Sequence, residues 1–306
     1  MAGPAVAAPG ASAAAGRPTT YIVSRTPGDT PEGIAVTSDG TVYVTSIATG
    51  AVYRGRVTDP QLHPFIPANA DGRGRAAGVH VDRWGRIFVA GYDTGTLYVY
   101  DRSGRLLLSR PTVAGVNLND FTFTDYAVYV TDSGTARVWR AALTGPSVGP
   151  LREWLGPDDF TPRATFPNGI VTTPGGRGLI VTDQDSLTFH VDIATRTVTP
   201  LTLIGVPDGL FSADGMLLEG HRLYGVYNFL DDSQPGGVAY VTRLLRLSND
   251  FRTATWVADS AKAPGGRLAT PTTIARDCHR LLWVNSQLGN APGTPPYTVT
   301  QVPGLR

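Results

Sequence analysis

A repeat with six copies places one residue at the start of each of its β-like runs. These starting residues are Glu32, Ala77, Asn119, Asn168, Asp214 and Thr272. Four of the six side chains end in a carboxylate or an amide, and none of the six residues is a cysteine or a histidine. Hard cations prefer such oxygen ligands in proteins. The repeat therefore predicts a site for Ca²⁺, with Mg²⁺, Mn²⁺ or Zn²⁺ as alternatives, held by Glu32, Asn119, Asn168 and Asp214.

Turn chemistry and a second aspartate offer alternatives to this assignment. Asn and Asp before Gly are ordinary turn residues, although that preference does not account for Glu32 or for the shared position in the repeat. Asp208, in Val-Pro-Asp-Gly-Leu, also resembles the start of a repeat. Asp208 lies 16 residues before Tyr224 and Asp214 lies 10 before it, so Asp214 better fits a tight hairpin. Asp208 stays as the alternative.

A second set of polar residues is predicted where the following strand of each repeat ends. Its members are Ser46, Asp93, Asp132, Asp183, Asn228 and either Asn285 or Ser286. Because an antiparallel second strand returns to the end at which the first began, we expect these side chains to surround a substrate. Asp120, next to Asn119, is a further candidate for acid–base chemistry. Asp132 and Asp183 are equally well explained as residues that cap loops.

The spacing of the repeats indicates the architecture that positions these side chains. Successive starting residues are 45, 42, 49, 46 and 58 residues apart, and about four short strands with their turns fill such an interval. The chain is therefore predicted to be an all-β, six-bladed β-propeller. Strands of the first blade are expected at 33–37, 41–46, 51–56 and near 63–67. The segment Thr20–Arg25 has no blade of its own and is predicted to supply the outer strand of the last blade, beside Tyr297–Val302.

Residues 1–18 differ in composition from the rest of the chain. They are mostly Ala, Gly and Pro without an aromatic residue, which predicts a disordered tail before a single propeller over residues 19–306. The small residues resemble the stretch that follows an export signal, so we expect a secreted or cell-envelope protein. A low-complexity tail on a cytoplasmic protein is the alternative. Two later stretches, Asp231–Gly237 and Asp250–Pro271, are expected to be loops that shape the pocket.

Composition and charge exclude several classes of protein. The 306 residues include 36 Gly and 24 Pro but only 17% charged residues, which is typical of a turn-rich β protein and not of a helical bundle. The net charge is +1 without a basic stripe, which disfavours nucleic-acid binding, and no apolar run is long enough to span a membrane. Lys262 is the only lysine, which disfavours Schiff-base chemistry. Cys278 is the only cysteine, which excludes an intrachain disulfide. We expect a monomer with a small-molecule substrate.

Nucleophilic serine catalysis is not expected. His80 should lie inside an inner strand, and the other histidines fall away from the predicted site. The sequence contains no G-x-S-x-G elbow, which is a signature of one large class of serine hydrolases. Chemistry assisted by a metal ion fits the oxygen-rich set better.

Four short motifs resemble the spaced signatures of the regucalcin/gluconolactonase family. They are Pro-Glu-Gly-Ile-Ala-Val around Glu32, Asn119-Asp120, Pro-Asn-Gly-Ile around Asn168, and Asp-Gly-Met at Asp214. The resemblance covers roughly residues 20–304 and implies a six-bladed propeller with metal-dependent lactonase or esterase activity. By position it implies that Glu32, Asn168 and Asp214 are metal ligands and that Asn119 is a fourth ligand or a substrate contact. It also implies that Asp214 serves as the general base.

The resemblance further implies a mechanism. The cation would polarise a lactone or ester carbonyl, while Asp214 or Asp120 takes a proton from the attacking water. Ala77 agrees with family members that have no ligand in the second blade. The chain departs from the family in two places, because the Pro-Asp-Gly of the base stands at Asp208 and because Leu118 stands where the family has a sugar-binding arginine. An aldonolactone is therefore not the expected substrate.

Two other classes of function are compatible with the same fold. Related propellers perform condensations, as strictosidine-synthase-like proteins do, or open antibiotics as lyases. A condensing enzyme needs a glutamate near the site, and the candidates are Glu32 and Glu219, of which Glu219 falls in a predicted turn. A non-enzymatic binding propeller would show an exposed apolar patch and would not need a buried cluster of Glu, Asn and Asp.

Overall fold

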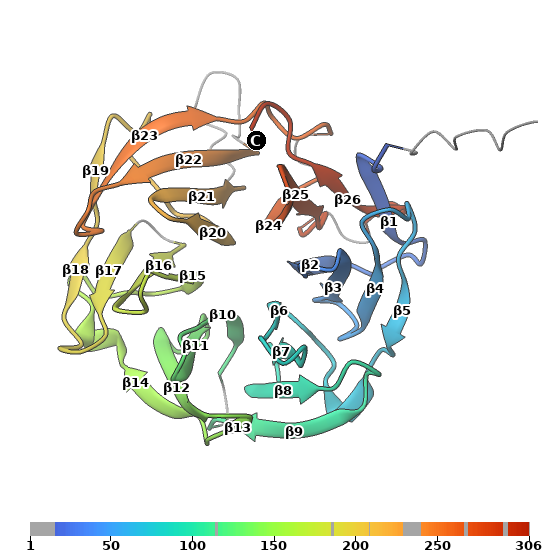
Figure 1. Cartoon of the computed structure of the whole chain (residues 1–306), viewed down its shortest axis with the longest axis horizontal. Helices are drawn as coiled ribbons and strands as arrows, with labels where there is room; N and C mark the ends of the chain where they lie inside the picture. Colours follow the sequence, from blue (N-terminus) through green and yellow to red (C-terminus); the bar gives the residue numbers. More distant parts are fainter. Residues whose placement is uncertain are drawn as a thin grey trace, which may run out of the picture.

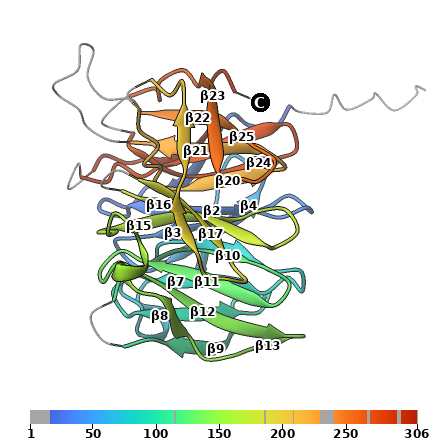
Figure 2. The same cartoon turned by 90° about the vertical axis from the view of Figure 1, so that its left-hand side faces the viewer.

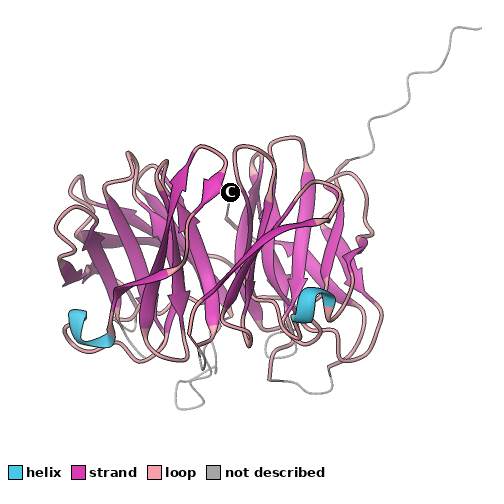
Figure 3. Cartoon of the chain, turned by 90° about the horizontal axis from the view of Figure 1, so that it is seen from below, coloured by secondary structure: helices cyan, strands magenta, loops and turns pink. Residues whose placement is uncertain are grey.

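The computed structural model shows six small β-sheets arranged in a ring around a central axis (Figure 1). It describes residues 16–113, 116–184, 187–207, 209–228, 240–265, 269–289 and 293–305. Seen from the side, the ring is a disc whose strands run between two faces (Figures 2 and 3). The prediction of an all-β, six-bladed propeller is confirmed. In these ranges no helix is long and apolar enough to cross a membrane.

Blades one to three each contain an antiparallel sheet with its first strand innermost. Blade one comprises β2 (Pro31–Val36), β3 (Thr41–Ser46), β4 (Val52–Arg56) and β5 (His63–Ile66). Blade two comprises β6 (Val79–Val81), β7 (Ile87–Gly91), β8 (Thr96–Tyr100) and β9 (Leu106–Pro111). Blade three comprises β10 (Leu118–Phe123), β11 (Ala127–Asp132), β12 (Arg137–Thr144), the short β13 (Ser147–Val148) and β14 (Arg152–Leu155). Two single-turn 3₁₀ segments, η1 (Ala70–Gly72) and η2 (Pro157–Asp159), lie in connections between blades.

Blades four to six complete the ring. Blade four comprises β15 (Pro167–Thr172), β16 (Gly178–Asp183), β17 (Thr188–Asp192) and β18 (Val198–Pro200). Blade five comprises β20 (Met216–Glu219), β21 (Arg222–Tyr227), β22 (Val241–Leu247), β23 (Thr253–Asp259) and an added edge strand, β19 (Thr202–Ile204), which pairs parallel to β23. Blade six comprises β24 (Pro271–Asp277), β25 (Arg280–Asn285), β26 (Tyr297–Gln301) and β1 (Thr20–Ser24).

The N-terminal strand closes the ring, as the sequence predicted. β1 pairs antiparallel with β26, with Tyr21 opposite Val299. The Tyr21 side chain is fully buried, and its hydroxyl donates a hydrogen bond to the Val57 carbonyl of blade one over 2.9 Å. The strand thus belongs to blade six and also contacts blade one, and no open edge is left at that seam.

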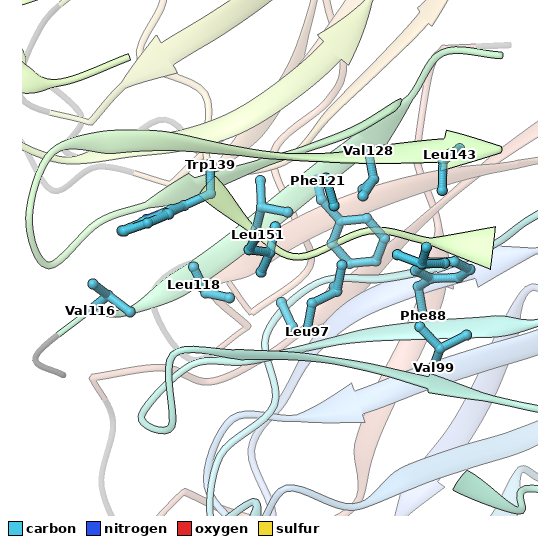
Figure 4. Close-up of a cluster of buried hydrophobic side chains, with 14 residues drawn as sticks. Phe88, Leu97, Val99, Val116, Leu118, Phe121, Val128, Trp139, Leu143 and Leu151 are labelled. Atoms are coloured by element: carbon cyan, nitrogen blue, oxygen red, sulfur yellow. The ribbon is translucent and has the colours of Figure 1, made fainter. Parts of the chain in front are cut away.

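The hydrophobic core consists of clusters between neighbouring blades. Figure 4 shows Phe88, Leu97 and Val99 of blade two facing Phe121 and Val128 of blade three. All five side chains are fully buried, and burying a side chain of this size stabilises a fold by about 1.5–3 kcal/mol. Because every blade packs on two neighbours in this way, the inner strands are held in fixed positions around the axis.

One of the two predicted loops contains a strand. Within Asp250–Pro271, residues Thr253–Asp259 form β23, which pairs with β22 on one side and β19 on the other. The prediction of a loop was wrong here. Two consecutive apolar residues of the strand, Trp256 and Val257, are both exposed to solvent, so the sequence does not show the alternation of apolar and polar residues that is typical of a half-buried strand. The other predicted loop, Asp231–Gly237, lies outside the described residues.

Candidate functional site

An irregularity at the start of the inner strands positions the predicted ligands. In blade one the pairing jumps from Pro31 opposite Ser46 to Ile34 opposite Val44, so Glu32 and Gly33 fall in a bulge. The same register shift occurs in blades three, four and six, and it encloses Asn119, Asn168 and Thr272. Bulges of this kind turn a side chain out of the regular alternation of a strand. Four of the six residues predicted from the repeat therefore occupy equivalent backbone positions, and Ala77 and Asp214 lie just before the first strands of their blades.

Threonines of the second strands hold these bulges together, and the sequence analysis missed them. Thr131 Oγ1 accepts a hydrogen bond from the Asp120 amide over 3.1 Å and donates one to the Asn168 carbonyl of the next blade over 2.6 Å. Thr45 Oγ1 makes the corresponding contacts in blade one, with the Gly33 amide and the Ala77 carbonyl. In blade four, Thr182 Oγ1 contacts two carbonyl oxygens, that of Gly169 over 3.2 Å and that of Ala213, next to Asp214, over 2.7 Å. The signal was present as a buried threonine directly before Ser46, Asp132 and Asp183.

Glycines in the bulges allow neighbouring inner strands to approach closely. A Cβ at Gly33 would lie 2.6 Å from the Ala77 carbonyl oxygen, and one at Gly169 would lie 2.5 Å from the Asp214 carbonyl oxygen. Both contacts are far too short for a side chain, so only glycine fits at these two positions. The Gly that follows Glu32 and Asn168 is therefore required by the packing around the axis.

Asp214 is the centre of the site. Asn168 Nδ2 donates a hydrogen bond to its Oδ1 over 2.9 Å, and Asn228 Nδ2 donates to its Oδ2 over 2.7 Å. Burial raises the pKa of Asp214 to about 7; the two amide hydrogen bonds oppose this effect and the nearby Asp120 adds to it. Three residues that the sequence analysis named thus meet at one buried carboxylate.

Glu32 faces the same space from blade one. Its side chain is 7% exposed, and its pKa is raised well above the ordinary value, first by burial and then by the negative charges of Asp214 and Asp120. Among the described residues no Arg, Lys or His forms an ion pair with Glu32 or Asp214. Two buried acids without a positive partner form a favourable place for a cation.

The side chain of Asn119 contacts a hydroxyl group. Its Nδ2 donates to Ser133 Oγ over 2.9 Å, and Ser133 Oγ donates to the Pro167 carbonyl over 2.8 Å, next to Asn168. No group of three or more His, Cys, Asp and Glu side chains in the described ranges is arranged to hold a metal ion. The predicted ligand set contains only two such residues, because its other members are amides.

Asp120 contacts a histidine that the sequence analysis had set aside. Its Oδ1 lies 3.1 Å from His80 Nε2 and accepts a hydrogen bond from the Phe121 amide over 2.8 Å. His80 belongs to the inner strand of blade two, as predicted, and its ring packs edge-on against Phe121 with 4.8 Å between ring centres. The contact joins two blades, so no spacing within one repeat could reveal it.

The second predicted set consists largely of side chains that hold loops. The Asp132 carboxylate accepts hydrogen bonds from the amides of Asn117, Gly134 and Thr135. Asp183 accepts from the amides of Thr165 and Phe166, and Ser46 Oγ accepts from the Thr49 amide. Asn228 contacts Asp214, and Asn285 contacts Thr298 and Thr300. Contact of this set with a substrate stays a prediction.

Two buried oxygens in the second set lack a protein partner within the described part of the chain. They are Asn285 Oδ1 and Ser286 Oγ, both in blade six. Buried polar atoms are almost always hydrogen-bonded. Asn285 Oδ1 can accept a hydrogen bond from a bound molecule or a water, and Ser286 Oγ can accept or donate one. The alternative fifth-blade residue, Asp208, lies outside the described residues.

The comparisons with known proteins show the fold. No model of a known protein family matches the chain, and no curated protein matches its sequence at a significant level. The major allergen Mala s 1 of Malassezia sympodialis is 15% identical, with a TM-score of 0.65 over 93% of this chain and 96% of that chain. A gluconolactonase from Xanthomonas campestris is 17% identical, with a TM-score of 0.62 over 90% of this chain and 87% of that chain. A calcium-binding regucalcin from Agrobacterium tumefaciens is 15% identical, with a TM-score of 0.60 over 94% of this chain and 95% of that chain.

Proposed function

We propose that the protein hydrolyses a lactone or an ester at the axis of the propeller, on the face where the inner strands begin. The observation that carries this proposal is the buried Asp214 carboxylate, which accepts hydrogen bonds from Asn168 and Asn228 and whose charge acts on the buried Glu32. The structural likeness to a gluconolactonase and to a calcium-binding regucalcin supports the same class of activity.

The donor set fits a divalent cation of the calcium type. Glu32 and Asp214 would supply two carboxylates, Asn168 an amide, and Asn119, at the equivalent position of blade three, a second amide. All are oxygen ligands, and the buried negative charge is not balanced by a basic side chain in the described ranges. When bound, such a cation would polarise the carbonyl of the substrate and stabilise negative charge on its oxygen.

The chain's own residues supply the remaining chemistry. Asp214 takes the proton of the attacking water, and a carboxyl whose pKa lies near 7 is suited to that role at neutral pH. Asn168 and Asn228 fix the orientation of this carboxylate from both sides. Asp120, held by His80, is the alternative base. The rigid ring keeps these groups in place, so little reorganisation is needed when the substrate binds.

A lactone panel with and without metal tests the proposal. The purified protein is stripped with a chelator, and hydrolysis of γ-butyrolactone, dihydrocoumarin and p-nitrophenyl acetate is followed after adding Ca²⁺, Mg²⁺, Mn²⁺ or Zn²⁺. We expect metal-dependent hydrolysis that falls by about 10²–10⁴-fold in Asp214→Asn. Asp125→Asn, an exposed aspartate in a turn of blade three, serves as the matched control. Full activity of Asp214→Asn in chelator would overturn the proposal.

A further inference from the structure

A large cavity in the described structure has a lining that does not include Glu32, Asn168 or Asp214. It has a volume of about 1060 Å³ and is lined mainly by blades one and two, with the inner strands of blades five and six also contributing. It lies toward the face where the first two strands of each blade are joined by turns. Thr37, Ser38 and Asp39 belong to that turn in blade one, at the opposite end of β2 from Glu32. The cavity is therefore a separate feature from the proposed hydrolytic site.

Its wall is apolar near the axis and basic near the rim. Ile34, Val81, Met216, Leu217 and Ile274 contribute the apolar part, together with His80. Five arginines and three aspartates line the cavity as a whole. A site with one apolar end and one charged end favours a ligand of the same character.

Two arginines at the rim have no carboxylate partner in the described part of the chain. The Arg54 guanidinium lies over the Phe65 ring, 4.0 Å from its centre, and Nη1 donates to the Arg102 carbonyl over 3.1 Å. The Arg102 guanidinium covers Gly85, where even a Cβ would come within 2.2 Å of it. Both guanidinium groups are thus positioned by the protein and keep donor capacity for an anion.

The other charged groups of the lining are largely satisfied. Asp39 accepts from Thr41 and pairs with Arg56 at 3.5 Å. Asp82 pairs with Arg86 at 2.7 Å. The remaining two arginines, Arg83 and Arg276, pair with Asp125 and Glu219 outside the lining. Asp59 accepts a hydrogen bond from the Gln61 amide over 3.0 Å. Because the lining contains five arginines and three aspartates, its net charge is positive.

The rim is built by a contact between the two blades. The turn that joins β8 to β9 in blade two reaches the outer strand of blade one, because the Phe65 ring would lie 3.1 Å from a Cβ at Gly104. Tyr43 packs against the same ring with 5.7 Å between ring centres. These contacts place an aromatic wall beside the guanidinium of Arg54, which suits an anion carried on an apolar body.

We propose that this cavity binds an amphiphilic organic anion. Its carboxylate or phosphate group is held by Arg54 and Arg102, and its apolar body lies along the wall of Ile34, Met216 and Ile274 toward the axis. Arginine is the residue best suited to such an anionic group because its planar fork can donate two parallel hydrogen bonds. The proposal does not depend on the hydrolytic function of the opposite face.

Isothermal titration with three probes tests the proposal. Decanoate carries both features, 1-decanol carries only the apolar body, and inorganic phosphate carries only the anion. We expect saturable binding of decanoate with one site per chain, and at least about tenfold weaker binding of the other two. Absence of saturable decanoate binding, or equal binding of inorganic phosphate, would overturn the proposal.

Substitutions at the rim locate the site. Arg54→Gln and Arg102→Gln should each weaken decanoate binding by about tenfold, because each removes a charge-assisted contact. Arg140→Gln is the matched control, since Arg140 stands opposite Tyr129 in blade three as Arg54 stands opposite Tyr43 in blade one. Arg54 and Arg102 are exposed, so the variants should keep the wild-type unfolding temperature. Unchanged decanoate affinity in both rim variants, or an equal loss in Arg140→Gln, would contradict the assignment.

Discussion

The side-chain amide of Asn228 donates a hydrogen bond to Asp214 Oδ2 over 2.7 Å and another to the Pro271 carbonyl over 2.9 Å. A residue at the end of the second strand of blade five thus connects the carboxylate of its own blade to the first strand of blade six. Because Asn168 holds the other carboxylate oxygen from blade four, the position of Asp214 depends on three adjacent blades.

Asn228→Ala should move the pH dependence of hydrolysis to higher pH. Burial raises the pKa of Asp214 to about 7, and the hydrogen bond from Asn228 opposes that rise. Its loss should raise the pKa further, so that the base becomes active only at higher pH. The pH profile of kcat/KM measures the shift. Asn249→Ala, in the exposed turn between β22 and β23, should leave the profile unchanged; an unshifted profile in Asn228→Ala would contradict the role of the contact.

Glu32→Gln should stabilise the metal-free protein and abolish its stabilisation by a cation. The substitution keeps the shape of the side chain but removes a carboxyl whose charged form is disfavoured by burial and by repulsion from Asp214 and Asp120. Thermal unfolding at pH 8, with chelator or with Ca²⁺, measures both effects. Glu153→Gln, a half-exposed residue on β14, is the control. If Ca²⁺ raised the unfolding temperature of Glu32→Gln as much as that of the wild type, Glu32 would be excluded as a ligand.

Thr131→Val should lower the free energy of unfolding by about 1–3 kcal/mol, because it leaves two buried backbone groups without their partner. These groups are the Asp120 amide and the Asn168 carbonyl. Urea unfolding measures the change, and Thr144→Val on the exposed side of β12 should change it by less than about 0.5 kcal/mol. Equal effects of the two substitutions would show that the threonine does not join the blades.

Tyr21→Ala should destabilise the protein by about 3–5 kcal/mol, as large-to-small changes at buried aromatic residues do. Tyr21 is fully buried in the closing strand, and its hydroxyl also accepts a hydrogen bond from Arg280 over 2.8 Å. Thr20→Ala changes an exposed residue of the same strand and should have little effect. If both variants unfold at the wild-type urea concentration, β1 does not secure the ring.

His190→Gln should reduce the loss of stability between pH 7.5 and pH 5.5. Burial lowers the pKa of His190 below 6.5, Arg252 lowers it further, and Asp192 and Asp250 oppose both. The unfolded chain therefore binds a proton at a higher pH than the folded chain does. The stability that His190 contributes is present above pH 6.5 and is lost as the pH falls through its folded pKa.

Urea unfolding at the two pH values measures this effect. His63→Gln, on the exposed outer strand of blade one, is the control. A pH dependence in His190→Gln that equals the wild-type dependence would show that another group is responsible.

Much of the fold could be predicted because the same pattern recurs in every blade. The alternation of apolar residues and the interval between repeats specify the strands, and the unassigned segment beginning at Thr20 left one place for ring closure. The alternation of apolar residues did not predict β23, because apolar residues of this strand face solvent although it pairs with β19 on one side and β22 on the other. Its pairing with β19 depends on tertiary packing, which a single repeat does not encode.

The site was predictable to the extent that it follows from position in the repeat. Asn168 and Asp214 meet because equivalent positions of adjacent blades lie close to the axis. The contact of His80 with Asp120 could not be predicted, since it depends on how far one inner strand slides past the next. The role of Asp132 as a loop cap was recognised only as an alternative, because a carboxylate at the end of a strand can serve either purpose.

The pairing of β1 with β26 also affects how the chain is made. Thr20 lies opposite Thr300, so the two strands of this pair are separated by nearly the whole length of the chain. The ribosome makes the partner of β1 only after the other five blades, and contacts of such high sequence separation form slowly. Blades two to five can fold before β26 has been made, whereas blade six can be completed only once β26 has emerged. A nascent or truncated chain that lacks β26 therefore presents an unpaired strand edge to chaperones and proteases.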